Sequence, residues 1–444
     1  MADGARDDRP GLDAASRWNP TGSLGRALTV GGVGVALALA MGRPAVVALV
    51  APLLVAGAIG VLNRPTREPR VYAAFGHIQL HEGQGTRVRL DAQDLDDVEH
   101  VVRAMVPQPY VALHPAEGAV GRLLDGDGIP PLEVSPRRWG LRTIGAEKVA
   151  FSTPWAGYRW GPVALLGREV SVLPSLAHFR SGGEAPQPIG LLGAHRSRRE
   201  GDGTEFSSIR RFHSGDRLRR INWRVSLRHG DLHVVSTRAE EDAAVLLIVD
   251  ALADFGTSGG IGGSESSLDV TIRAAAALAE QYVSGGDRVS LRVLSPGGEY
   301  AGYGTGTRHL RRMQILLSRI RPGVPRDVAI DQIDFRATAG TVVVVISPML
   351  SEPLASATVR LVRRGLPVIV IDPLPEGTTP TAYPDAEQQV ARLAWRMRLL
   401  DRNHLLDRLA AAGCPVVPWN GPRTLEEVLR RIARRGQMPR VGRS

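Results

Sequence analysis

Two apolar runs near the N-terminus constrain the fold of this chain more than any other feature. They occupy residues 27–42 and 44–62, and only Arg43 interrupts them. A helix needs about 20 apolar residues to cross a bilayer, which the second run supplies alone and the first supplies with its flanks. Arg43-Pro44 is typical of a tight turn whose arginine reaches the membrane interface. The pattern predicts a transmembrane hairpin over residues 27–63.

A cleaved signal peptide is the alternative, but it has one apolar run of about 7–15 residues, which this sequence exceeds. Arginines flank the hairpin on both sides: Arg6, Arg9, Arg17 and Arg26, then Arg64, Arg67 and Arg70. Because positive residues stay on the cytoplasmic side, both ends and everything after residue 63 are expected there. We therefore expect an inner (cytoplasmic) membrane protein. Residues 1–26 are polar at their start, without periodicity, and are predicted as a disordered cytoplasmic tail.

The rest of the composition excludes several classes of protein. The net charge is +10, but basic and acidic residues are mixed along the chain and no zinc-finger or aromatic-rich pattern accompanies them, so no nucleic-acid partner is expected. Lys148 is the only lysine, which favours a genome-wide preference for arginine as the source of the charge. Cys414 is the only cysteine, so an internal disulfide scaffold or cysteine zinc site is impossible.

Residues 70–190 have the pattern of short strands. Apolar residues alternate over 77–80 and 86–90, with a Glu-Gly-Gln-Gly turn between these runs, and Gly-Pro clusters punctuate the rest. No long helical period appears, so the region predicts a β-sandwich-like domain. Three tryptophans are expected to pack its core or a corner rather than form a ligand surface: Trp139, Trp155 and Trp160.

Residues 240–436 alternate strands with helices. The apolar run 243–250 ends in Asp250 and predicts a buried parallel strand. Ser267 precedes a run with helical spacing, and Thr424 opens a capping box before a last helix. Further strands are expected over 288–294, 341–346 and 367–371, and helices over 307–320, 352–364 and 384–411. This order predicts a Rossmann-like α/β domain whose ligands bind outside the carboxyl ends of the strands, near Asp250.

The segment 193–235 between these regions is the most distinctive part of the sequence. Its spaced signature consists of Glu205, Phe206, Arg210, Gly215, Asp216, Arg219, Ile221, Asn222 and Trp223. Arginine pairs with carboxylates through two parallel hydrogen bonds, so one interpretation is a buried network that docks the segment on the following domain. The other interpretation is a recognition surface that presents Arg219 and Trp223, two residue types enriched in interface hot spots.

These spaced residues resemble the signature of a family catalogued as domain of unknown function 58, approximately E-F-x-x-(L/I)-R-x-(Y/F)-x-x-G-D-x-x-R-x-I-x-W. The order of hairpin, β region, signature and α/β domain is similar too, so the resemblance extends over nearly the whole chain. It implies a von Willebrand A-like C-terminal domain that docks a MoxR-type AAA+ ATPase. The implied role is non-enzymatic, in assembly, maturation or envelope-related processes.

Two alternatives remain open. In the von Willebrand A family the first strand ends in D-x-S-x-S, whose oxygens hold Mg²⁺. Here the positions read Asp250, Leu252 and Asp254, and a later acid is replaced by Ser347. We therefore expect no cofactor, with Asp250 and Asp254 as weak candidates in a Mg²⁺-dependent adhesion-type module. The second alternative is a serine hydrolase using Ser258, which sits in a G-x-S-x-G pattern without the strand that must run into the serine.

Overall fold

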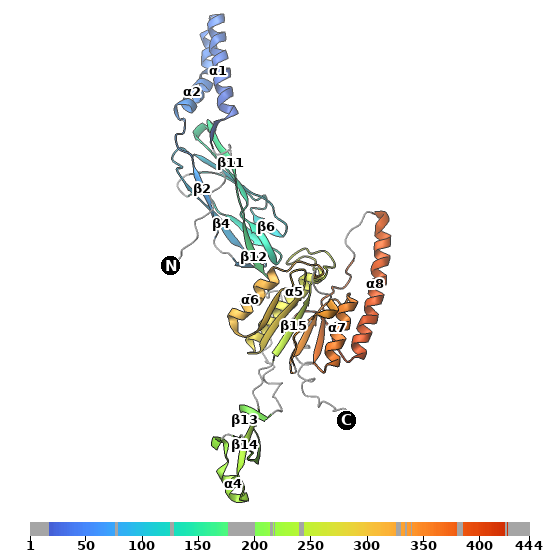
Figure 1. The fold of residues 1–444 in the computed structure, drawn as a ribbon. Helices are drawn as coiled ribbons and strands as arrows, with labels where there is room; N and C mark the ends of the chain where they lie inside the picture. Colours follow the sequence, from blue (N-terminus) through green and yellow to red (C-terminus); the bar gives the residue numbers. More distant parts are fainter. Residues whose placement is uncertain are drawn as a thin grey trace. The chain divides into compact units, whose positions relative to one another are not determined.

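The computed structural model describes residues 17–75, 79–124, 128–175, 200–213, 216, 218–238, 244–325, 330–333, 335–338, 340–379, 385–421 and 424. The chain divides into two compact units, Met1–Leu173 and Pro174–Ser444 (Figure 1). The first holds two apolar helices and a β-rich region, and the second holds a β-hairpin and a mixed α/β region. The predicted last helix lies outside the described residues, except for Thr424.

Two helices form the hairpin, α1 (Gly22–Met41) and α2 (Pro44–Leu62). Both are long and apolar enough to cross a membrane, and they indicate a membrane anchor. Glycines let the helices approach closely, as small residues do in membranes. A Cβ added to Gly34 would lie 2.4 Å from Cγ1 of Val50, so this position tolerates no side chain unless Val50 or the helices move.

The predicted disordered tail is wrong for its last residues. Trp18–Pro20 form strand β1, which pairs with β11 (Tyr158–Leu165), and α1 then begins at Gly22. The indole of Trp18 donates a hydrogen bond to the carbonyl oxygen of Arg67, at 2.7 Å. These partners lie far away in the sequence, and they order a segment whose own composition predicts disorder. Residues 1–16 lie outside the described residues.

Three sheets build the β-rich region, in the orders β1-β11-β10-β5-β7, β2-β4-β8-β6 and β3-β12-β9. All neighbouring strands are antiparallel except β3 and β12. Their remaining strands are β2 (Arg70–Phe75), β3 (Gln79–His81), β4 (Thr86–Gln93), β5 (His100–Met105), β6 (Val111–His114), β7 (Ala119–Leu123), β8 (Leu132–Pro136), β9 (Gly140–Ile144), β10 (Glu147–Ser152) and β12 (Arg168–Leu173). Apolar side chains of the first two sheets pack into one cluster, as the predicted sandwich requires.

The three tryptophans of this region do not share one environment. Trp160 packs in the cluster between the sheets and lies 5.5 Å from Phe151, ring centre to ring centre. Trp139 is buried as well. Trp155 instead lies in the short 3-10 helix η2 (Pro154–Ala156) with 68% of its surface exposed. The expectation of a core position is therefore wrong for Trp155.

A charge pair is buried inside the β-rich region. Arg103 on β5 and Glu147 on β10 are fully buried, and two hydrogen bonds of 2.8 and 2.9 Å join them. Arg103 also donates to the carbonyl oxygens of Pro130 and Val88. Burial raises the pKa of the Glu147 carboxyl, and the Arg103 guanidinium opposes that rise.

A six-stranded sheet forms the α/β region, in the order β17-β16-β15-β18-β19-β20, and only the edge strand β17 is antiparallel. Its strands are β15 (Ala244–Asp250), β16 (Arg288–Leu294), β17 (Tyr300–Gly304), β18 (Val342–Ile346), β19 (Val368–Asp372) and β20 (Val416–Pro418). The helices are α5 (Ser267–Ser284), α6 (Gly306–Ser318), α7 (Glu352–Arg363) and α8 (Asp385–Ala411), with a short 3-10 helix, η5 (Ile330–Gln332).

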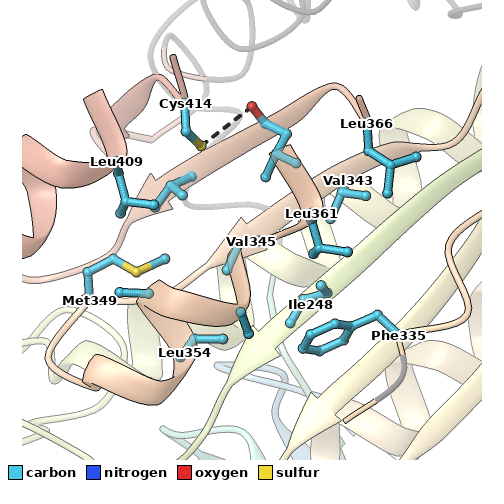
Figure 2. Close-up of a cluster of buried hydrophobic side chains, with 14 of the residues drawn as sticks. Ile248, Phe335, Val343, Val345, Met349, Leu354, Leu361, Leu366, Leu409 and Cys414 are labelled. Carbon is cyan, nitrogen blue, oxygen red and sulfur yellow. Dashed lines mark hydrogen bonds between the residues drawn. The ribbon is translucent and has the colours of Figure 1, made fainter. Parts of the chain in front are cut away.

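Alternate residues of the central strands pack against α7 and α8. Figure 2 shows Ile248 of β15 and Val345 of β18 in this cluster, together with Leu361 of α7 and Leu409 of α8. Cys414 lies at its edge and is buried, with its thiol donating to the carbonyl oxygen of Val368 at 3.6 Å. Strands β15 and β18 are buried over nearly their whole length, as parallel strands covered on both faces are.

The buried charge pair generates the first prediction. Glu147→Gln leaves the Arg103 charge buried without a counter-ion, and arginine cannot lose its proton, so the opening free energy of this region should fall by about 3–5 kcal/mol. Hydrogen exchange of peptides from β5 and β10, measured by mass spectrometry on the full chain, reports this loss. Glu133→Gln is the matched control, because the Arg87–Glu133 pair is exposed and should contribute under about 1 kcal/mol. Equal effects of the two substitutions would contradict the prediction.

Candidate functional site

The signature segment folds into a β-hairpin with helices at its closed end. Strands β13 (Glu200–Arg211) and β14 (His233–Arg238) pair in antiparallel fashion, and between them lie η4 (Leu218–Arg220) and α4 (Trp223–His229). Glu205 and Phe206 fall on β13, where the structure describes only their backbone, and Phe206 pairs with Thr237. Gly215 lies outside the described residues.

A charge pair holds the turn that follows β13. The two terminal nitrogens of Arg210 donate to the two carboxylate oxygens of Asp216, at 2.8 and 2.7 Å. The backbone N–H of His213 donates to the same carboxylate at 2.8 Å. The hydrogen bond from Arg210, and next the one from the His213 backbone, lower the pKa of Asp216 to about 2. The Arg–carboxylate contact that the sequence predicts is thus made inside the hairpin itself.

Asn222 and Ile221 position α4 on β14. The Asn222 side-chain oxygen caps the helix by accepting from the backbone N–H of Val225 at 3.2 Å, and the backbone N–H of Asn222 donates to the carbonyl of His233 at 2.8 Å. Ile221 forms an isolated bridge with Val234. Ser226 faces β14 and its hydroxyl accepts from the N–H of His233 at 2.8 Å. Ile221 and Asn222 therefore determine where the helix lies and which face it turns outward.

The outward face carries apolar and basic side chains together. Trp223 is 62% exposed and Leu227, one helical turn later, is 82% exposed. We define the α4 surface as the exposed residues Leu218, Arg219, Trp223, Arg224, Leu227 and Arg228. The signature pattern predicts Arg219 and Trp223 as surface residues but not Leu227, although the spacing of four residues from Trp223 places Leu227 on the same face once a helix is assumed. Tryptophan and arginine are the side chains most enriched in interface hot spots.

A second candidate site lies where the strand order reverses, at the carboxyl ends of β15 and β18. Asp250 accepts hydrogen bonds from the Leu252 backbone N–H at 3.0 Å and from the Ser347 hydroxyl at 2.6 Å. Burial raises the pKa of Asp250, and these two hydrogen bonds oppose the rise, that of Ser347 more strongly. Asp254 accepts from the Leu268 backbone N–H at 3.1 Å, near the start of α5.

This arrangement does not fit the oxygen-rich shell that Mg²⁺ requires. Both carboxylates accept hydrogen bonds from protein groups, the hydroxyl of Ser347 points its proton at Asp250, and Leu252 offers no side-chain oxygen. Within the described ranges, no group of three or more His, Cys, Asp or Glu side chains could hold a metal ion.

Ser258 does not sit in a nucleophile elbow. Strand β15 ends at Asp250 and α5 begins at Ser267, so Ser258 lies within the loop that joins them. Its hydroxyl accepts a hydrogen bond from the Gly260 backbone N–H at 3.2 Å. The strand–serine–helix geometry that the hydrolase motif requires is therefore not formed around this residue.

Comparison with protein families gives a match over the middle of the chain. Residues 208–388 match the model of the family described as "Protein of unknown function DUF58". The match begins within β13, after Glu205 and Phe206, and ends within α8, so it is narrower than the resemblance drawn from the sequence. No curated protein matches the chain.

The buried Asp250 generates the second prediction. Because its folded pKa is raised, the unfolding free energy is highest below the unfolded carboxyl pKa, about 3.9, and falls as pH rises through the folded value. Asp250→Asn should remove this fall, while Ser347→Ala should extend it to higher pH by deleting a hydrogen bond that lowers the pKa. Hydrogen exchange of β15 at a series of pH values, corrected for intrinsic rates, measures both effects. The same pH profile in all three proteins would contradict the assignment.

Proposed function

We propose that this protein, whose residues 208–388 match the model of the DUF58 family, is a membrane-anchored protein-interaction module without catalytic activity of its own. One observation carries the proposal: Trp223 and Leu227 lie exposed on one face of α4, at 62% and 82%. The Arg210–Asp216 pair and the Asn222 cap hold this helix before any partner arrives. A preformed surface reduces the ordering cost of association, so exposed apolar side chains there favour binding.

The chemistry of the α4 surface indicates an acidic partner with an apolar pocket. Arg219, Arg224 and Arg228 surround the apolar pair and are all exposed. Complementary charge steers such encounters and selects partners, and a tryptophan that becomes buried in the complex supplies a large part of the binding free energy. We propose a MoxR-type AAA+ ATPase as this partner, in assembly or envelope-related processes. The family resemblance of the signature supports this choice.

We also propose that the α/β region is a von Willebrand A-like docking domain. When the strands are numbered from β15, their order in the sheet is 3-2-1-4-5-6, which is the order of the doubly wound fold and supports this proposal.

An ATPase partner also requires the soluble regions to face the cytoplasm. Exposed Arg17, Arg26, Arg64 and Arg67 at the two ends of the hairpin support that side of the inner membrane.

The test is capture of the partner from native membranes. The full chain, solubilised in mild detergent, serves as bait in wild-type form and as Trp223→Ala. Loss of a central hot spot should lower recovery of an AAA+ ATPase about tenfold or more, equivalent to roughly 1.4 kcal/mol. Leu166→Ala is the control, because Leu166 is also a highly exposed apolar residue, at 80%, and lies outside the α4 surface.

Two further arms separate the alternatives. Asp216→Ala should reduce recovery as Trp223→Ala does, because the turn before α4 loses its charge pair. Capture repeated with a chelator tests the adhesion-type alternative, which requires Mg²⁺. Recovery of the ATPase equal in wild type and Trp223→Ala would place the docking face elsewhere. Failure of every bait to recover an AAA+ ATPase would overturn the proposed partner.

A further inference from the structure

One loop of the β-rich region contacts the end of the helical hairpin at which α1 begins and α2 ends. We name residues Thr153–Gly157 the Trp155 loop; it precedes β11 and contains η2. The Thr21 backbone N–H donates to the carbonyl of Gly157 at 3.0 Å, and the Thr21 hydroxyl donates to that of Ala156 at 2.5 Å. Thr21 is the N-cap of α1, so the loop lies at the point where that helix begins.

The loop also contacts the other end of the hairpin. A Cβ added to Gly157 would lie 3.3 Å from Cα of Gly60, in the last turn of α2. The Trp155 loop is therefore in contact with the start of α1 and with the end of α2. These two ends leave the membrane on the same side, because the helices are antiparallel and joined by a short turn. The loop consequently lies at the level where the hairpin emerges from the bilayer.

Trp155 is held outward from this loop in an unfavourable backbone conformation. Its φ is +62° and that of Ala156 is +49°, in the left-handed region that non-glycine residues seldom occupy. Its side chain is 68% exposed, whereas Trp139 and Trp160 are buried. Strained conformations persist where the surrounding structure imposes them, and they concentrate at functional positions. Exposure of an indole by a strained loop is not explained by packing within the β-rich region.

Basic side chains gather at the same level. Arg26 lies one turn into α1, Arg64 follows α2 directly, and Arg159 is the second residue of β11, all exposed. Arginines next to a membrane helix are attracted to the anionic lipids of the cytoplasmic leaflet. An exposed tryptophan among them matches the interfacial belt, where the ring lies at headgroup depth with its N–H solvated.

We propose that the Trp155 loop is a second membrane contact, with the Trp155 indole inserted at headgroup depth in the leaflet from which the hairpin emerges. The partner is the lipid surface itself. The proposal rests on the membrane anchor but not on the ATPase. The hairpin holds the loop at the bilayer, so insertion is intramolecular and a single indole suffices. The contact fixes the β-rich region against tilting about the hairpin.

The experiment uses tryptophan quenching by lipids that carry bromine on the acyl chain near the headgroup. The full chain is reconstituted into vesicles of brominated or ordinary lipid, as wild type, Trp155→Phe and Leu166→Trp. The difference in emission between wild type and Trp155→Phe is the emission of Trp155. This emission should be quenched in vesicles of brominated lipid. The emission of the tryptophan introduced by Leu166→Trp should not be quenched, because Leu166 lies beyond the other end of β11, about 25 Å along the strand.

A second measurement leaves Trp155 in place. Ala156→Cys carrying a nitroxide label should be more accessible to oxygen than to a polar nickel complex, and buried Cys414 does not compete for the label. Flotation of the vesicles first shows that the chain is membrane-bound. Trp155 emission that is unquenched in a floating protein, or a label more accessible to nickel, overturns the proposal and leaves the anchor intact. A chain that fails to float overturns the anchor and this proposal together, whatever the outcome of partner capture.

Discussion

The hydrocarbon core of a bilayer offers no hydrogen-bond partner to the peptide backbone, and the first unit of the protein is arranged around this constraint. Two helices satisfy their own backbone groups, and glycines such as Gly31 and Gly34 bring them into contact. Outside the apolar stretch the backbone groups need other partners. Thr21 and β1 supply them at the start of α1 by bonding to β11 and the loop before it, so this helix follows a strand of the sheet directly.

The parts of the fold that were predictable depend on local periodicity. The apolar runs gave the hairpin, the alternation over residues 86–90 gave a strand, and the continuous run before Asp250 gave the central strand of a parallel sheet. Short edge strands carry too little pattern: β17 is rich in glycine, and β20 has three residues. The burial of Arg103 was not predictable, because a charged residue in a strand is expected to face solvent. Its partner Glu147 lies 44 residues further on, so no local pattern links the two.

Only part of the candidate site was predictable from the sequence. The sequence placed Arg210 and Asp216 near each other, since they are six residues apart, and the structure joins them. It could not assign separate roles to the rest of the signature. Asn222 and Ile221 act on the helix position, whereas Arg219 and Trp223 face solvent, and that difference depends on how α4 lies on β14. Ser347 bonds to Asp250 across 97 residues, a contact that no local pattern reveals.

The charge pair beside the α4 surface also determines how this surface responds to its surroundings. Because the pKa of Asp216 is lowered to about 2, and an arginine side chain does not lose its proton in proteins, both partners stay ionised at every acidity that a cellular compartment reaches. The Arg210–Asp216 pair itself therefore keeps its charges over that range of acidity. The hydrogen bonds that this pair contributes to the turn before α4 are thus the same in an acidic and in a neutral compartment, and acidification alone does not withdraw them from the α4 surface.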